Sequence, residues 1–195
     1  MGRIKSALEI ALERTESVKS DKASIDLYGA KQRGKKLANE FLSDPGIKLE
    51  EEFKKTPKDQ AASLKQGVFD VLISQITLPS SPEDALRIEA AGKGLQTVIG
   101  NSRFAALYKQ MTQAVSHYLD QAAQYEEAIK RQYAPKLRQK EEELSRRMGR
   151  EVRIDPFQDP EFIAFYNQHM NALKENYETT LNQVRAEAIR LFGEP

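Results

Sequence analysis

The amino-acid sequence predicts an all-α protein: a body of short N-terminal helices followed by a long antiparallel, coiled-coil-like helical hairpin. Apolar residues recur at steps of three and four along most of the chain, which is the spacing of one helix face. At 81–82 and at 159–160 a capping Ser or Asp precedes Pro, the order typical of helix starts. These patterns predict a helical body over residues 1–101 and a hairpin over residues 103–195.

The body should contain four helical segments. The first apolar stripe begins near Ile4 and ends at the turn signal SDPG. A short amphipathic stretch, IKLEEEFKKT, follows it. The next helix is expected to use Thr56 as its N-cap and Pro57 as its first residue. The fourth should run from Pro82 to Gly100, because Gly commonly follows the last helical residue.

Two long apolar stripes predict the hairpin. The first runs from about residue 103 to Met148, and only Pro135 interrupts it. We expect Pro135 to kink this helix or to mark a joint. The second stripe begins after Asp159 and has a similar length. Two such stripes joined by a short polar link are typical of an antiparallel pair of helices.

The link at residues 149–158 forms the tip of the predicted hairpin. Gly149 suits the left-handed position after a helix. Val152 and Ile154 then alternate with charged residues, as in a short strand. These apolar side chains and Phe157 need cover, either from the hairpin itself or from another chain. We therefore predict a protein-contact site at the tip, comprising Arg150, Val152, Arg153, Ile154 and Phe157.

Composition excludes several classes of protein. The chain has 30 basic and 29 acidic residues, and its net charge of +1 gives no general reason to expect a polyanionic partner. It has no cysteine, which excludes disulfides and thiolate chemistry. Glu9 and Glu13 interrupt the N-terminal apolar pattern, so we expect no secretory signal. The most apolar window contains Asp70 and is too short to cross a bilayer. A soluble, cytoplasmic protein without membrane contact is expected.

No metal or cofactor is expected either. The only histidines are His117 and His169, and neither belongs to an HExxH or a Glu-x-x-His motif. If the hairpin closes near residue 154, His117 would face Phe192. His169 would face Gln139, so the two histidines should not meet.

Glycine and lysine occur together in AKQRGKKLA and in AAGKGLQT. Neither stretch has the spacing of a phosphate-binding loop, and neither follows a predicted strand. We expect these glycines to let helices approach closely or to permit a bend. The aromatic residues of the two long stripes have helical spacing, which favours a seam between helices over a platform for stacking bases.

Three segments of the sequence resemble a family of short bacterial proteins of unknown function. They are MGRIKSALEIALERT, QYAPKLRQKEEELSRRMGREVRIDP and DPFQDPEFIAFYNQHMNAL. The resemblance covers most of the chain and implies a bacterial, cytoplasmic protein. It assigns no role to any residue.

The function that the sequence favours is a non-enzymatic scaffold or adaptor that acts through helix–helix contacts and self-associates, most simply as a homodimer. An alternative is a nucleic-acid-binding helical protein, although the basic residues spread around most of a helix. Its candidate residues are Lys31, Arg33, Lys35 and Lys36, with the arginines at 146–153. An enzyme with a carboxylate or tyrosine site is a second alternative. It is the least favoured because no groups show catalytic spacing.

Overall fold

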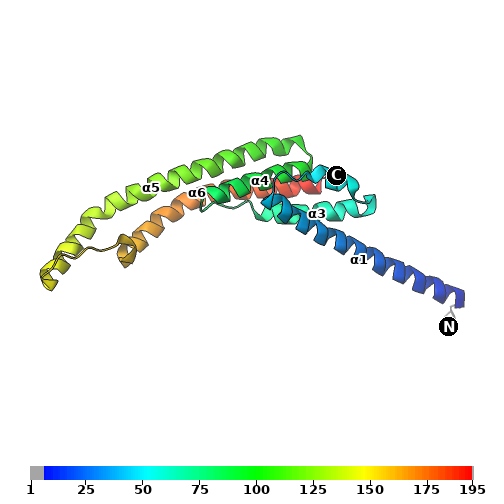
Figure 1. Ribbon diagram of the computed structural model, residues 1–195, viewed down its shortest axis with the longest axis horizontal. Coiled ribbons are helices and arrows are strands. Elements are labelled where there is room, and N and C mark those ends of the chain that lie inside the picture. The colour runs from blue at the N-terminus through cyan, green and yellow to red at the C-terminus, as the bar shows by residue number, and fades with distance from the viewer. Residues whose placement is uncertain (1–6, 195) are drawn as a thin grey trace, which may run out of the picture. The chain divides into compact units, whose positions relative to one another are not determined.

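The computed structural model describes residues 7–194, with side chains from residue 24 onward. Ile4 and the start of the first predicted stripe lie outside the described residues. The prediction of an all-α protein is confirmed. Within residues 7–194 the secondary structure consists of α1 (Ala7–Ser43), α2 (Leu49–Lys55), α3 (Lys58–Ser74), α4 (Pro82–Ile99), α5 (Ser102–Met148), the 3-10 turn η1 (Pro156–Gln158) and α6 (Pro160–Gly193) (Figure 1).

The helices divide into two compact units. One unit contains the residues up to 75 together with 90–101, and the other contains 76–89 together with 102–194. The last turns of α4 therefore belong to the first unit, and its first turns belong to the second.

In the first unit, α1 and α3 cross with their backbones in contact. A Cβ atom added at Gly34 would lie only 2.1 Å from the carbonyl oxygen of Leu64. One added at Gly67 would lie 2.0 Å from the carbonyl oxygen of Lys31. Each glycine thus makes room for the main chain of the other helix. The expectation that the glycine of AKQRGKKLA permits close helix approach is confirmed.

The same principle applies at Gly94 on α4. A Cβ atom there would lie 2.6 Å from Cδ1 of Leu72 and 2.9 Å from Cε1 of Phe41. Small and large apolar side chains interdigitate around these positions, as in other close-packed cores. The most deeply buried members of this unit are Ala30, Ala38, Val68, Leu72, Ala91 and Leu95.

Helix termini largely follow their local signals. Ser81 caps α4, because its Oγ accepts a hydrogen bond from the Asp84 amide at 3.2 Å. Gly100 and Gly149 both have positive φ angles after the ends of α4 and α5. The prediction for Thr56 is wrong. Its hydroxyl donates to the carbonyl of Glu52 at the end of α2, and α3 begins after Pro57.

The second unit is built on the long helices α5 and α6, which lie side by side (Figure 1). α5 continues through Pro135 without a break. The predicted register is wrong. His117 lies 2.7 Å from the Tyr177 hydroxyl, and the ring of His169 packs against Tyr125.

The link between the helices explains this register. Residues 151–155 have no regular secondary structure and run back along the end of α5. The amide of Val152 donates to Oγ of Ser145 at 2.9 Å, and that of Ile154 donates to Oε1 of Glu141 at 2.9 Å. The strand-like alternation therefore yields an extended segment that is held by α5 side chains. Because this segment covers the last turns of α5, α6 begins opposite earlier turns.

Aromatic and aliphatic side chains form the seam between α5 and α6. Tyr133 and Phe162 are buried, and their rings pack edge to face at 5.2 Å. Ile129 and Met170 complete the buried part of this cluster. The aromatic residues that the sequence placed on the two stripes thus include members of an interhelical core.

Candidate functional site

The predicted contact residues at the tip are partly covered by the hairpin itself. Val152 and Ile154 are half-buried against the end of α5. Phe157 stacks edge to face on Phe162 at 5.2 Å and on Tyr166 at 5.3 Å, but 46% of its surface stays exposed. The chain therefore supplies part of the cover that these apolar residues need.

The arginines of the tip lie at the surface. Arg150 is exposed, and Arg153 pairs with Glu151 at 3.2 Å while its side chain stays 86% accessible. Arg147 pairs with Glu143 one helical turn earlier, at 2.6 Å. Exposed pairs of this kind contribute about 0–1 kcal/mol to stability. Their guanidinium groups remain accessible to a partner.

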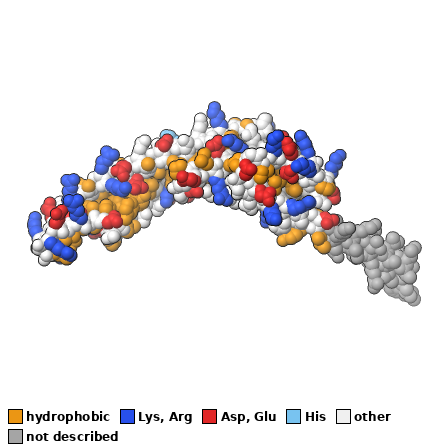
Figure 2. All heavy atoms as spheres, viewed as in Figure 1, with side chains coloured by type: hydrophobic (Ala, Val, Ile, Leu, Met, Phe, Trp, Pro, Cys, Tyr) orange, Lys and Arg blue, Asp and Glu red, His pale blue; other side chains and the backbone are white. Residues whose placement is uncertain are grey.

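Large apolar side chains are also exposed near the tip. They lie at the end of α5, in η1 and in the first turn of α6, and comprise Leu144, Met148, Phe157 and Ile163. Figure 2 shows hydrophobic side chains gathered along this end of the hairpin, with basic side chains beside them. Leu144 and Met148 lie one turn apart at the end of α5, whereas Phe157 lies over Lys130 on an earlier turn, with Ile163 in the adjoining first turn of α6. Exposed apolar groups of this kind are typical of interaction surfaces.

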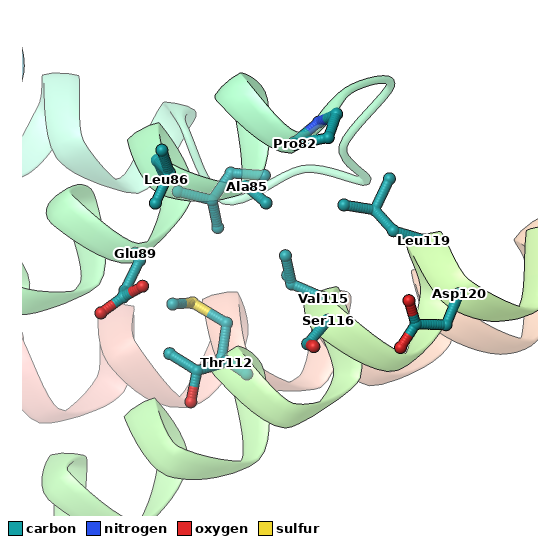
Figure 3. Close-up of a pocket in the computed structure, with 11 residues that line it drawn as sticks. Pro82, Ala85, Leu86, Glu89, Thr112, Val115, Ser116, Leu119 and Asp120 are labelled. Atoms are coloured by element: carbon teal, nitrogen blue, oxygen red, sulfur yellow. The ribbon is translucent and has the colours of Figure 1, made fainter.

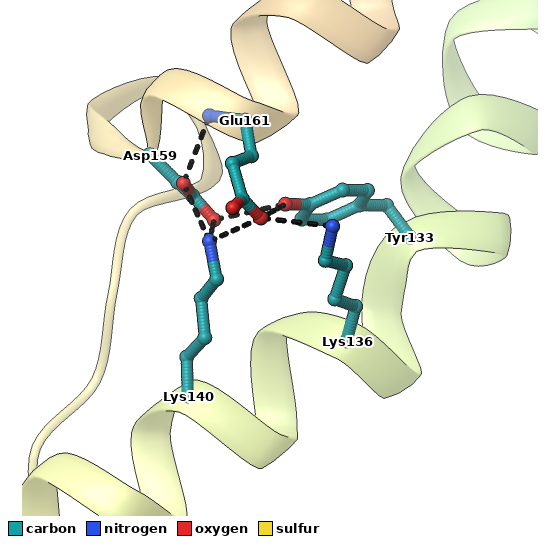
Figure 4. Close-up of polar contacts among 5 residues, drawn as sticks. All are labelled: Tyr133, Lys136, Lys140, Asp159 and Glu161. Atoms are coloured by element: carbon teal, nitrogen blue, oxygen red, sulfur yellow. Dashed lines mark hydrogen bonds and ion pairs between the residues drawn. The ribbon is translucent and has the colours of Figure 1, made fainter.

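A polar network ties the start of α6 to α5 (Figure 4). Lys140 lies 2.8 Å from Asp159 Oδ2 and 2.9 Å from Glu161 Oε2. Lys136 reaches the same Glu161 oxygen at 2.8 Å. The Tyr133 hydroxyl donates to Asp159 Oδ2 at 3.1 Å. Asp159 is 5% exposed and also caps α6 by accepting from the Glu161 amide.

The charges of this network stabilise one another. Hydrogen bonds from Lys140 lower the pKa of Asp159, and the ammonium groups of Lys136 and Lys140 lower the pKa of Glu161 to about 2. The two carboxylates in turn raise the pKa of Lys140. Burial, followed by the nearby Asp159, raises the pKa of Tyr133. The raised pKa values mean that Lys140 and Tyr133 keep their protons. Protonated groups of this kind suit a role in holding α6 against α5 better than a role as nucleophile or general base.

Sequence reasoning missed an open groove between the first turns of α4 and the first half of α5. Its volume is about 440 Å³ (Figure 3). Ile88, Met111 and Val115 are buried beneath it. Apolar side chains of α4 form one edge: Pro82, Ala85 and Leu86. The pattern of each helix was visible in the sequence, but the groove exists only because these two segments are adjacent in space.

The opposite edge of the groove is polar. Thr112, Ser116 and Asp120 follow one another at single-turn steps along α5. Glu89 of α4 lies at one end, where it accepts a hydrogen bond from the Tyr108 hydroxyl at 3.5 Å. Figure 3 shows Glu89 and Asp120 at opposite ends of the space that Leu86 and Val115 border.

The basic residues of the nucleic-acid alternative do not form one stripe. Lys31 pairs with Asp70 of α3 at 2.8 Å, and Arg33 donates to the side chain of Gln60. Lys35 is half-buried, whereas Lys36 is exposed. Two of the four cations thus contact α3 of their own chain.

The described part of the chain contains neither a metal-binding cluster nor a membrane-spanning helix. Within it, no three His, Asp or Glu side chains are grouped closely enough to hold a metal ion. No helix there is both long and apolar enough to span a membrane.

The geometry defines an all-α protein in which the long helices α5 and α6 lie side by side. Apolar side chains are exposed near the link between them, and an open groove lies between α4 and α5. Comparison with known proteins then gives its family. Residues 50–190 match the family of unknown function DUF6657, and the chain belongs to that family. Neither a curated protein nor a solved structure matches the chain.

Proposed function

We propose that this protein is a non-enzymatic scaffold or adaptor of the bacterial cytoplasm that binds other proteins through its helical surfaces. The exposed apolar side chains at the hairpin tip carry this proposal. Met148 is 53% exposed at the end of α5, two residues before the exposed Arg150, and Ile163 is 38% exposed in the first turn of α6. Apolar groups next to arginine are the composition that protein interfaces favour.

The tip is also tied to both long helices by side-chain contacts. The Ser145 and Glu141 side chains fix the extended link, and Phe157 is stacked on α6. A surface that is ordered before binding loses less conformational entropy when a partner docks. The network around Asp159 also links the first turn of α6 to Lys140 of α5. These features fit a contact surface better than a catalytic one.

Quantitative affinity capture from native cells tests the proposal. The bait is the full chain, compared with a Met148→Ser, Ile163→Ser variant. Both side chains are exposed, so the substitutions should leave the fold intact. The matched control is Ile189→Ser, which removes an equally exposed side chain near the other end of α6. We expect at least one partner to be lost with the tip variant and retained with the control.

Identical partner sets for all three baits would contradict a role for the tip. A further bait, Phe157→Ser, removes a side chain that packs on Phe162 and Tyr166. If this bait loses a partner and its melting temperature also falls, the loss reflects reduced stability and not a direct contact. We further propose that the protein self-associates as a homodimer.

A further inference from the structure

The α4–α5 groove has two chemically different edges and a buried apolar floor. Along α4 the edge is apolar, and Leu86 is 68% exposed there. Along α5 the edge carries hydroxyl and carboxylate groups at steps of one turn, from Thr112 through Ser116 to Asp120. An exposed leucine beside an open trough leaves apolar surface in water, which is unfavourable by about 25 cal/mol per Å².

The charges at the groove have one sign. Glu89 and Asp120 are the ionisable residues of its lining, and no lysine or arginine occurs among the described residues that line it. The adjoining hollow along α5 adds His117 and Tyr108 and again no lysine or arginine. A ligand that complements this site therefore has an apolar side and a positive charge next to it.

We propose that the α4–α5 groove binds an amphipathic helix of a partner protein, with a lysine or arginine flanking the apolar stripe. The apolar stripe of that helix covers Leu86 and Val115, and its basic residue contacts Asp120. This inference deepens the proposed adaptor function by naming the class of partner, and it rests on that function.

The shape of the groove favours a helix over a compact ligand. The trough lies along two helices, and its polar groups on α5 are one turn apart. Side chains at i and i+4 of a bound helix have the same spacing, so successive turns can meet successive polar groups. Laying an apolar helix face into a hydrophobic groove is a common mode of peptide recognition.

Direct binding of designed peptides to the full-length protein tests this proposal. Two fluorescent helical peptides share one leucine stripe, and their flanking positions carry lysine in one and glutamate in the other. Fluorescence anisotropy at low salt measures both affinities. We expect the lysine peptide to bind about fivefold more tightly, which is the scale of exposed ion pairs. Raising the salt concentration should reduce this difference.

Three variants locate the binding site. Asp120→Lys should abolish or reverse the preference for the lysine peptide. Glu142→Lys makes the same charge change on the distal part of α5 and should leave the preference unchanged. Leu86→Ser should weaken the binding of both peptides. Because Leu86 is 68% exposed, the substitution should leave the fold intact.

Equal affinities for the two peptides, or equal effects of Asp120→Lys and Glu142→Lys, would overturn the proposal. A second result would also overturn it. If neither peptide binds, but a small organic amine binds saturably and Leu86→Ser abolishes that binding, the occupant of the groove is a small molecule. The two groove variants, Asp120→Lys and Leu86→Ser, lie outside the hairpin tip. If the peptide-binding proposal fails, the adaptor proposal can therefore still be tested by the capture experiment with the Met148 and Ile163 variant.

Discussion

At the scale of single residues, the close crossing of α1 and α3 depends on two glycines that have no side chain. Gly34 and Gly67 lack the Cβ atoms that would collide with the carbonyl oxygens of Leu64 and Lys31. The obstacles are backbone atoms, so neither can move aside by changing rotamer. At this distance each helix can also place a Cα–H group against a carbonyl of the other.

Replacing Gly34 with alanine should therefore destabilise the protein, although alanine is the better helix former. We expect a loss of about 2 kcal/mol or more, because overpacking against fixed backbone outweighs the gain of about 1 kcal/mol in helix propensity. Gly29→Ala is the matched control on the same helix, since a Cβ atom there meets nothing within 4 Å. It should stabilise the protein by about 0.5–1 kcal/mol.

Urea unfolding followed by circular dichroism measures both variants. If Gly34→Ala unfolds at the same urea concentration as the wild type, α1 and α3 do not approach as closely as described.

At the scale of elements, the start of α6 is determined by the link and by the polar network below it. The extended residues 151–155 use the last turns of α5 as their support. Asp159 then caps α6 and at the same time accepts from Lys140 and Tyr133 of α5. One carboxylate thus fixes where the helix begins and which turn of α5 it faces.

The network makes the stability of the α5–α6 pair depend on pH in the acidic range. Glu161 has a pKa of about 2 in the folded protein against an ordinary value of 4.5. Because the folded value is the lower one, its ion pairs stabilise the protein above about pH 4.5. This contribution declines as the pH falls toward 2. Asp159, whose pKa is also lowered, acts in the same direction.

Thermal unfolding at several pH values between 6 and 2.5 tests this. Glu161→Gln should lower the melting temperature at pH 6, and the difference from the wild type should shrink as the pH falls. Glu142→Gln should follow the wild type closely, since the nearest guanidinium lies 3.8 Å from Glu142 and both side chains are well exposed. A constant gap between Glu161→Gln and the wild type would contradict the role assigned to its ion pairs.

At the scale of the whole molecule, exposed apolar residues occur on several helices. Ile25 and Tyr28 of α1 are 69% and 65% exposed. Long helices that leave apolar residues uncovered gain stability when another chain covers them. This is the physical basis for the proposed homodimer, whose simplest form has two-fold symmetry.

Sedimentation equilibrium at tens of micromolar protein tests self-association. We expect a mass of twice the 22.1 kDa of one chain. A single species with the mass of the monomer across that concentration range would contradict the dimer. Repeating the measurement with Ile25→Ser and with Tyr28→Ser would show whether the exposed face of α1 contributes to the contact.

The sequence by itself determined the helical class, most helix ends and the location of the link. These features depend on local signals. They are the apolar spacing along each helix, the capping Asp159 before Pro160, and Gly149, a glycine that can adopt the positive φ angle found after α5. Tertiary structure alone decided which residues face one another. The link lies back along α5 and so shifts the register from the one predicted for His117 and His169. The groove beside Asp120 likewise needs two segments that are distant in sequence, because a shared surface depends on packing and not on the local pattern of either helix.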